Sequence, residues 1–232
     1  QELQKFLYPA DKAIVGIEEI SDELLADLPN LKLISKYGVG LNNIDLNTIK
    51  QRGILLGFTP GPNKQSVAEL ALILILISLR KIPRSLDNIR NKIWSQQKGR
   101  ELFNKTIGIV GYGNIGKALA KLLTPFNCKI LFFDKFEENQ NSAVKAELNF
   151  LLNKSDVVSI HLPLNQDTRH LFDKKTFSLM KEDVVIVNTS RGGIINEKDL
   201  HIFLEINDRS FAALDVFENE PSFDNPLLSL KN

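Results

Sequence analysis

The residues that decide the fold are Gly111-Tyr112-Gly113-Asn114-Ile115-Gly116, which follow the apolar run Ile107-Gly108-Ile109-Val110. The run predicts a buried β-strand, and the residues after the loop predict a helix. In such a loop Gly111 permits a tight turn, Gly113 lets the backbone approach a pyrophosphate, and Gly116 lets the helix pack closely on the strand. Pattern and context together predict a Rossmann-type dinucleotide-binding unit.

An acidic residue follows this loop at the distance expected of a ribose-binding carboxylate. Asp134 ends the next apolar run, 18 positions after Gly116, where about 20 are typical. Its carboxylate can accept hydrogen bonds from ribose hydroxyls and would repel a 2′-phosphate, which favours NAD over NADP, although the adjacent Lys135 weakens that preference. The alternative is a glycine-rich turn that binds no nucleotide, and the combination of strand, helix and acid makes it the weaker interpretation.

Short apolar strands alternate with helical segments along most of the chain. The predicted strands are residues 13–17, 31–35, 54–56, 107–110, 129–133, 156–160, 183–187 and 211–214. The predicted helices are residues 21–28, 67–79, 115–123, 147–152, 176–180 and 196–204. This alternation predicts the α/β class, with a Rossmann-type doubly wound parallel sheet and a smaller α/β unit.

A stretch dense in turn-forming residues, Thr59-Pro60-Gly61-Pro62-Asn63, indicates a domain boundary. We expect a smaller domain in residues 1–63 and the Rossmann domain in residues 64–232. Ser66 and Glu69 fit a capping box at the start of the helix that runs to Leu79. That helix is apolar nearly all round, so we interpret it as a hinge or dimerisation helix that is buried on most sides.

Composition and charge exclude several functional classes. The 232 residues are 43% hydrophobic and 25% charged, and the net charge of +1 provides no surface for nucleic acid. The longest apolar stretch, residues 70–77, is far shorter than the roughly 20 residues of a membrane span. The single Cys128 suits a reducing compartment, so we expect a cytoplasmic protein. No residues have metal-ligand spacing, and no metal is expected.

Two later loops bring charged residues to the carboxyl edge of the predicted sheet, where open parallel sheets bind ligands. Arg191 lies in Asn188-Thr189-Ser190-Arg191-Gly192-Gly193, and its guanidinium can hold a substrate carboxylate with two parallel hydrogen bonds. A surface arginine in a salt bridge is the alternative, but the flanking glycines predict a close backbone approach. Residues 215–221 place acids at the same edge, where one acid can orient a proton-donating histidine.

Three histidines remain to be placed. His161, which precedes Leu162-Pro163, ends a predicted strand, so it is a candidate for the cofactor pocket and not for catalysis. Chance packing of a histidine at a strand end is an equally good explanation. His170 and His201 are interpreted as surface or packing residues.

Together these segments resemble the D-isomer-specific 2-hydroxyacid dehydrogenases, and most closely the phosphoglycerate dehydrogenase-like branch. The resemblance runs from about Ala13 to the end of the chain. Besides the glycine loop, its markers are Lys36-Tyr37-Gly38-Val39-Gly40, Asn43-Ile44-Asp45, Asn63, Val67-Ala68-Glu69, Ser155-Asp156-Val157-Val158, His161-Leu162-Pro163-Leu164, residues 188–193 and residues 215–221. Several motifs in a fixed order are more specific than any one of them.

The resemblance implies an NAD-dependent oxidoreductase that acts as a homodimer on a small D-2-hydroxy or 2-oxo acid, with 3-phosphoglycerate-like acids among the candidates. It implies that Arg191 anchors the substrate and that Glu220 pairs with the catalytic histidine. The implied cofactor contacts are Gly111, Gly113, Asn114, Ile115, Gly116, Asp134, His161, Pro163, Thr189, Ser190, Arg191 and Asp215. The implied substrate contacts are Lys36, Gly38, Val39, Gly40 and Arg191. Residues 1–63 would then be part of an incomplete flavodoxin-like substrate-binding domain.

Two features depart from the family pattern. The acid–base histidine of the family lies in a Pro-His segment, which we expect beyond Asn232 together with the closing part of the substrate domain. An opening strand is likewise expected before Gln1. Asn42 stands where the family usually has Asp. We expect a longer natural chain, because Glu220 is useful chiefly as the partner of that histidine.

Two other functions stay open. Some relatives are NAD-responsive corepressors that do not catalyse a reaction, although no peptide-docking motif is evident here. Others oxidise a different small anion, such as formate or phosphite. Lys36 and Lys64 would suit a phosphorylated acid, but solvated lysines are the more common outcome.

Overall fold

The computed structural model describes residues 2–139 and 142–232. Its contacts divide the chain into two compact units, Gln1–Asn63 and Lys64–Asn232. Each unit has its own parallel sheet and its own apolar core.

The smaller unit contains three parallel strands in the order β1-β2-β3. Its elements are α1 (Glu2–Leu7), β1 (Lys12–Val15), α2 (Asp22–Ala26), β2 (Leu33–Lys36), α3 (Leu46–Gln51) and β3 (Leu55–Gly57). Side chains start the two crossover helices: Ser21 accepts the backbone N–H of Leu24, and Asp45 accepts those of Asn47 and Thr48. These caps fix where the chain turns back toward the next strand.

The larger unit contains six parallel strands in the order β6-β5-β4-β7-β8-β9. The strands are β4 (Thr106–Val110), β5 (Lys129–Phe133), β6 (Val144–Lys145), β7 (Val157–Ile160), β8 (Val185–Asn188) and β9 (Phe211–Leu214). The order reverses between β4 and β7, which is the point at which doubly wound sheets bind ligands. This topology confirms the predicted Rossmann-type α/β fold.

The strand register places the loops that follow β4, β5 and β7 next to one another at one edge of the sheet. Val110, the last residue of β4, pairs with Phe133 of β5 on one side and with Ile160 of β7 on the other. Because the strands are parallel, the residues that follow them leave the sheet at the same edge.

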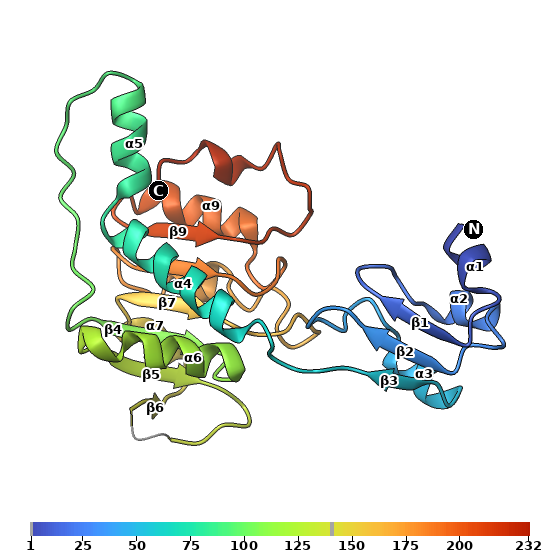
Figure 1. The fold of residues 1–232 in the computed structure, drawn as a ribbon. Helices are drawn as coiled ribbons and strands as arrows, with labels where there is room; N and C mark the ends of the chain where they lie inside the picture. Colours follow the sequence, from blue (N-terminus) through green and yellow to red (C-terminus); the bar gives the residue numbers. More distant parts are fainter. Residues whose placement is uncertain (1, 140–141) are drawn as a thin grey trace. The chain divides into compact units, whose positions relative to one another are not determined.

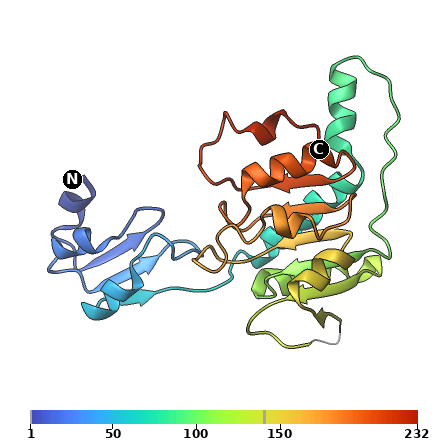
Figure 2. The ribbon, with the colours of Figure 1, turned by 180° about the vertical axis from the view of Figure 1, so that it is seen from behind.

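Helices cover both faces of this sheet (Figures 1 and 2). One face carries α4 (Lys64–Leu79) and α6 (Asn114–Leu123), and the other carries α7 (Leu148–Lys154), α8 (Lys174–Phe177) and α9 (Glu197–Ile206). Strands β7 and β8 are buried at every position, as expected when both faces are covered. Short 3-10 turns occur at Thr124–Phe126 and Pro226–Ser229.

Helix α5 (Ile82–Arg90) extends away from the sheet, and residues 91–105 return from it to β4 (Figure 1). None of its residues is buried, and its apolar side chains Ile82, Leu86 and Ile89 are exposed. Within the described part of the chain, no helix is both long and apolar enough to cross a bilayer.

Several predicted details are wrong. Helix α4 begins at Lys64, so Ser66 lies inside the first turn and cannot form the predicted capping box; Glu69 instead accepts a hydrogen bond from Gln65. Helix α8 begins at Lys174, earlier than predicted, because Asp173 caps it. The interpretation of α4 as a hinge or dimerisation helix stays a prediction, because its residues buried within this chain are Ala68, Ala71, Ile75, Ser78 and Leu79. Four elements were not predicted: α1, α3, α5 and β6.

Candidate cofactor and substrate site

The glycine loop after β4 combines two crowded positions with one open position. Gly111 has φ +96°, and a Cβ there would lie 2.5 Å from the carbonyl oxygen of His161. A Cβ at Gly116 would overlap the carbonyl oxygen of Gly111. A Cβ at Gly113, in contrast, would meet no protein atom within 4 Å. The bare backbone of Gly113 therefore faces space that a ligand can fill.

The start of α6 borders this space. Gly113 is its N-cap residue, and no side chain caps the helix. The N–H groups of the first turn are thus available, and the helix dipole adds partial positive charge. A pyrophosphate fits both features.

Asp134 lies beside the glycine loop and is already partly engaged. One carboxylate oxygen accepts the N–H of Tyr112 at 2.8 Å, and the other accepts those of Phe136 and Glu137 at 2.8 and 3.2 Å. A carboxylate offers about four lone-pair positions, so about one remains for a ribose hydroxyl.

Lys135, which weakened the preference for NAD, is held elsewhere. Its ammonium group lies 2.8 Å from the carboxylate of Asp167. This hydrogen bond, followed by the charge of Lys135, lowers the pKa of Asp167. Lys135 is therefore already paired with a carboxylate of the protein itself.

Among the described residues, two buried polar atoms at predicted cofactor positions have no hydrogen-bond partner: Nδ1 of His161 and Oγ1 of Thr189. Leaving such atoms unpaired costs free energy, so both positions suit a ligand that supplies the missing partner. Nε2 of His161 lies 2.9 Å from the hydroxyl of Ser159. Burial lowers the pKa of His161 to about 4, which makes its ring neutral and a poor proton donor near pH 7.

Asn188, the last residue of β8, shapes the loop that carries Arg191. Its side-chain oxygen accepts the N–H and the hydroxyl of Ser190 at 3.0 and 2.7 Å, and its amide donates to the carbonyl of Arg191 at 2.9 Å. Asn188 was not among the predicted site residues, although asparagine side chains commonly accept the backbone N–H two residues ahead and so form turns.

Arg191 itself is free to bind an anion. Its guanidinium donates to the carbonyl of Ser190 at 2.6 Å. No ion pair found among the described residues involves it. The alternative of a surface salt bridge therefore has no support here, and most of the five guanidinium donors stay available.

The loop after β9 packs directly on the Arg191 loop. The N–H of Asp215 donates to the carbonyl of Asn188 at 3.0 Å, and a Cβ at Gly192 would overlap the backbone of Phe217. The close approach predicted for the glycines is thus, at Gly192, an approach to the neighbouring loop. Glu220, which is exposed, accepts the N–H of Phe217 at 2.9 Å.

The described histidines do not contact Glu220. His170 lies 2.7 Å from Glu218, and His201 lies 3.4 Å from Glu205. In residues 2–139 and 142–232, no group of three or more His, Cys, Asp or Glu could hold a metal ion.

The remaining predicted residues, Lys36, Gly38, Val39 and Gly40, lie in the smaller unit at the carboxyl end of β2. The ammonium group of Lys36 donates to the carbonyl of Gly16 and, at 2.8 Å, to the side chain of Asn43. These two hydrogen bonds use two of its three N–H donors, and the role of Lys36 toward a substrate stays a prediction.

Comparison with known proteins identifies the larger unit. Residues 72–232 match the family model described as the NAD-binding domain of D-isomer-specific 2-hydroxyacid dehydrogenases. The chain belongs to the D-isomer-specific 2-hydroxyacid dehydrogenase family. This confirms the resemblance, the class of NAD-dependent oxidoreductases and the cofactor NAD. The open glycine loop and the start of α6 can hold the phosphates of NAD, and Asp134 can hold a ribose.

Curated relatives are similar over the whole chain. A hydroxypyruvate reductase of Thermotoga maritima is 38% identical over 100% of this chain and 78% of its own length. A D-3-phosphoglycerate dehydrogenase of Methanocaldococcus jannaschii is 35% identical over 100% of this chain, which spans only 46% of that protein.

Solved structures in the family have the same fold. A D-lactate dehydrogenase from Aquifex aeolicus, complexed with NAD and lactic acid, has a TM-score of 0.87 and 31% identity, with 97% of this chain and 73% of that chain covered. An NAD-dependent formate dehydrogenase from Staphylococcus aureus, in complex with NAD, has a TM-score of 0.87 and 32% identity, with 99% and 72% covered.

The open space at Gly113 can be tested with one added methyl group. We expect Gly113→Ala to weaken NAD binding about tenfold or more, a loss of at least about 1.4 kcal/mol, because the methyl group occupies the approach of the pyrophosphate. The thermal midpoint should stay at the wild-type value. Isothermal titration calorimetry and thermal unfolding measure the two effects.

Gly108→Ala is the matched control, since its methyl group would overlap Ser155 and Leu151 beneath β4. We expect it to destabilise the protein by about 1–3 kcal/mol. Wild-type NAD affinity in Gly113→Ala would contradict the assignment of the open space.

Proposed function

We propose that the protein transfers a hydride between NAD(H) and C2 of a small D-2-hydroxy acid or 2-oxo acid. The observation that carries this proposal is Arg191, which forms no ion pair among the described residues and lies at the sheet edge that also carries the glycine loop. A guanidinium in that state suits a substrate carboxylate.

Arg191 would fix the carboxylate of the 2-oxo acid and so direct its C2 toward the nicotinamide. Holding two reactants in this way makes their encounter effectively unimolecular. Bound NADH supplies the hydride. Asn188 contributes by shaping the loop, since its hydrogen bonds to Ser190 and to the backbone of Arg191 limit the positions that the guanidinium can take.

The proton for the carbonyl oxygen needs a separate donor. We propose an acid–base histidine beyond Asn232, held and charged by Glu220. In support, His161 is neutral and buried, His170 is bound to Glu218, and His201 is bound to Glu205. Acid–base assistance of this kind typically accelerates a reaction about 100- to 10,000-fold.

Among possible substrates we favour small unphosphorylated acids over 3-phosphoglycerate. Lys36, which suggested a phosphate site, is bound to Gly16 and Asn43. Identity does not separate the two classes, since a hydroxypyruvate reductase and a glyoxylate reductase are 38% and 36% identical and two D-3-phosphoglycerate dehydrogenases are 35% and 39% identical, so the preference rests on Lys36. Formate is the second candidate, because a formate dehydrogenase is among the similar structures and its substrate is also a small carboxylate.

We also propose that two copies form a homodimer through α5 and the outer side of α4. The apolar side chains Leu86, Ile89 and Trp94 are exposed there, the last by 94%, and Ile73 of α4 is exposed as well. Large exposed apolar side chains on a helix and in the segment that follows it are a feature of interaction surfaces when they form a continuous patch, which is what we propose here.

The first prediction concerns activity. With NADH, the full-length protein should reduce hydroxypyruvate or glyoxylate with a higher kcat/KM than 3-phosphohydroxypyruvate, measured by the loss of absorbance at the NADH band. If formate is the only acid that reduces NAD to NADH, the second candidate is favoured. Absence of turnover with every acid, in a sample that binds NAD, would contradict the proposed reaction.

The second prediction concerns the anchor. Arg191→Ala should lower kcat/KM for the 2-oxo acid by about 100-fold or more, because a bidentate charged contact is lost. Arg191→Lys should recover only part of it, since an ammonium group lacks the planar fork. Arg209→Ala, which removes a surface arginine bound to Glu182, is the control and should change nothing. Equal kcat/KM in Arg191→Ala and wild type would remove Arg191 from the mechanism.

The third prediction concerns the dimer. Replacing Leu86 and Ile89 by Asp should convert a dimer into a monomer, because charge is unfavourable in an apolar interface. Sedimentation velocity would show the halved mass. Phe136→Asp, at another exposed aromatic of the same unit, is the control and should leave the mass unchanged. A wild-type protein that sediments as a monomer would exclude this interface.

A further inference from the structure

The loop of residues 215–221 presents Asp215 and Glu220, both of which are exposed. Inside the loop, the N–H of Phe217 donates to the carboxylate of Glu220 at 2.9 Å. This local bond fixes the shape of the turn. It does not fix the position of the loop relative to other segments.

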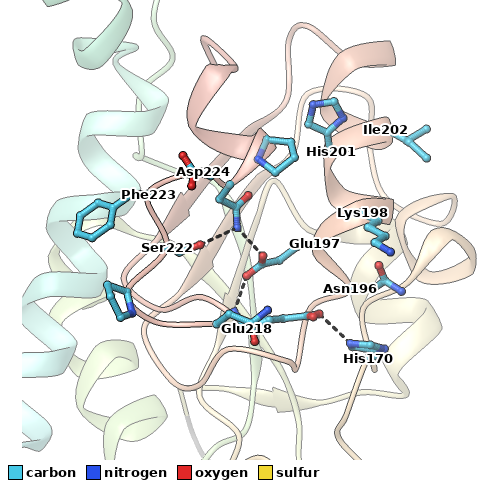
Figure 3. A pocket seen from close by; sticks show the side chains of 14 residues that line it. His170, Asn196, Glu197, Lys198, His201, Ile202, Glu218, Ser222, Phe223 and Asp224 are labelled. Atoms are coloured by element: carbon cyan, nitrogen blue, oxygen red, sulfur yellow. Dashed lines mark hydrogen bonds and ion pairs between the residues drawn. The ribbon is translucent and has the colours of Figure 1, made fainter.

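Glu218, in the same loop, is held from outside by two partners. Its carboxylate lies 2.7 Å from Nε2 of His170, and its N–H donates to Glu197 at 2.6 Å. The other carboxylate oxygen of Glu197 accepts the amide of Asn225 at 2.6 Å. Figure 3 shows these side chains as a continuous chain of hydrogen bonds along a cavity of about 800 Å³.

His170 is itself fixed to the loop that carries Arg191. Its backbone N–H donates to the carbonyl of Gly193 at 2.8 Å. Its φ of +50° lies in the left-handed region, which is uncommon for residues other than glycine, although histidine, asparagine and aspartate adopt it more often than the rest. A backbone in such a conformation is kept only where the surrounding contacts require it.

We propose that His170 is a positioning residue. Through Glu218 it holds the 215–221 loop, and with it Glu220, against the loop that carries Arg191. The consequence for catalysis rests on the function proposed above, whereas the holding of the loop does not. The His170 and Glu218 side chains are 36% and 25% exposed, so the pair adds little to global stability and its effect is local.

Two substitutions of His170 separate positioning from stability. Asparagine accepts a positive φ readily but is too short to reach Glu218. Glutamine reaches it, with Nε2 close to the place of the imidazole Nε2, but tolerates the backbone conformation less well. A structural role predicts that His170→Gln is the more damaging variant, whereas a positioning role predicts that His170→Asn is.

In the full-length protein we expect His170→Asn to lower kcat about 10- to 100-fold, because a small displacement of Glu220 impairs proton transfer. The KM for NADH and the thermal midpoint should stay near wild type, and His170→Gln should recover most of kcat. Hydrogen exchange of the Glu218 amide should become about tenfold faster in His170→Asn. His201→Gln, at the other histidine that lines the cavity, is the control and should match wild type.

Unchanged exchange in His170→Asn would overturn the proposal, as would faster exchange with wild-type kcat. A lower kcat in His170→Gln than in His170→Asn would also overturn it, in favour of a role in stability alone. If the wild-type protein reduces no 2-oxo acid, the proposed function fails, and the exchange measurement by itself decides whether His170 holds the loop.

Discussion

The larger unit depends on the close approach of two backbones at the switch point of its sheet. Gly111, after β4, lies so near the carbonyl of His161, after β7, that no side chain fits between them. The register of the strands makes this approach possible, because Val110 and Ile160 pair at the ends of β4 and β7. Around this contact lie the open face of Gly113, the start of α6 and the buried ring of His161.

The glycines of this unit fall into two groups, which differ in the space available for a side chain. At Gly108, Gly111, Gly116 and Gly192 a Cβ would overlap protein atoms, so these residues are required for packing. At Gly113 a Cβ would meet nothing, so packing does not explain the residue. A glycine with space in front of it is informative about a ligand, and the comparison with NAD-binding relatives agrees with that interpretation.

Local patterns in the sequence predicted most of the sheet, because buried strands and the glycine loop are determined by neighbouring residues. Helix α5 was missed because its apolar side has no core in this chain to pack against. The hydrogen bonds of Lys36 to Gly16, 20 positions away, and to Asn43, 7 positions away, were not predicted. The contact between His170 and Glu218, which are 48 positions apart, was not predicted either. Contacts between loops depend on the fold, so no local pattern could have indicated them.

Acidic residues lie in the loop next to the Arg191 loop, yet no ion pair among the described residues involves Arg191. Three acids, Asp215, Glu218 and Glu220, belong to the loop that packs on the Arg191 loop. Two of the three carboxylates have hydrogen-bond partners other than Arg191, since Glu218 is bound to His170 and Glu220 accepts the N–H of Phe217. Asn188 meanwhile shapes the loop of the arginine. A partly buried guanidinium that forms no ion pair among the described residues carries a charge that an external anion could neutralise, and this supports the proposal that Arg191 binds the substrate carboxylate.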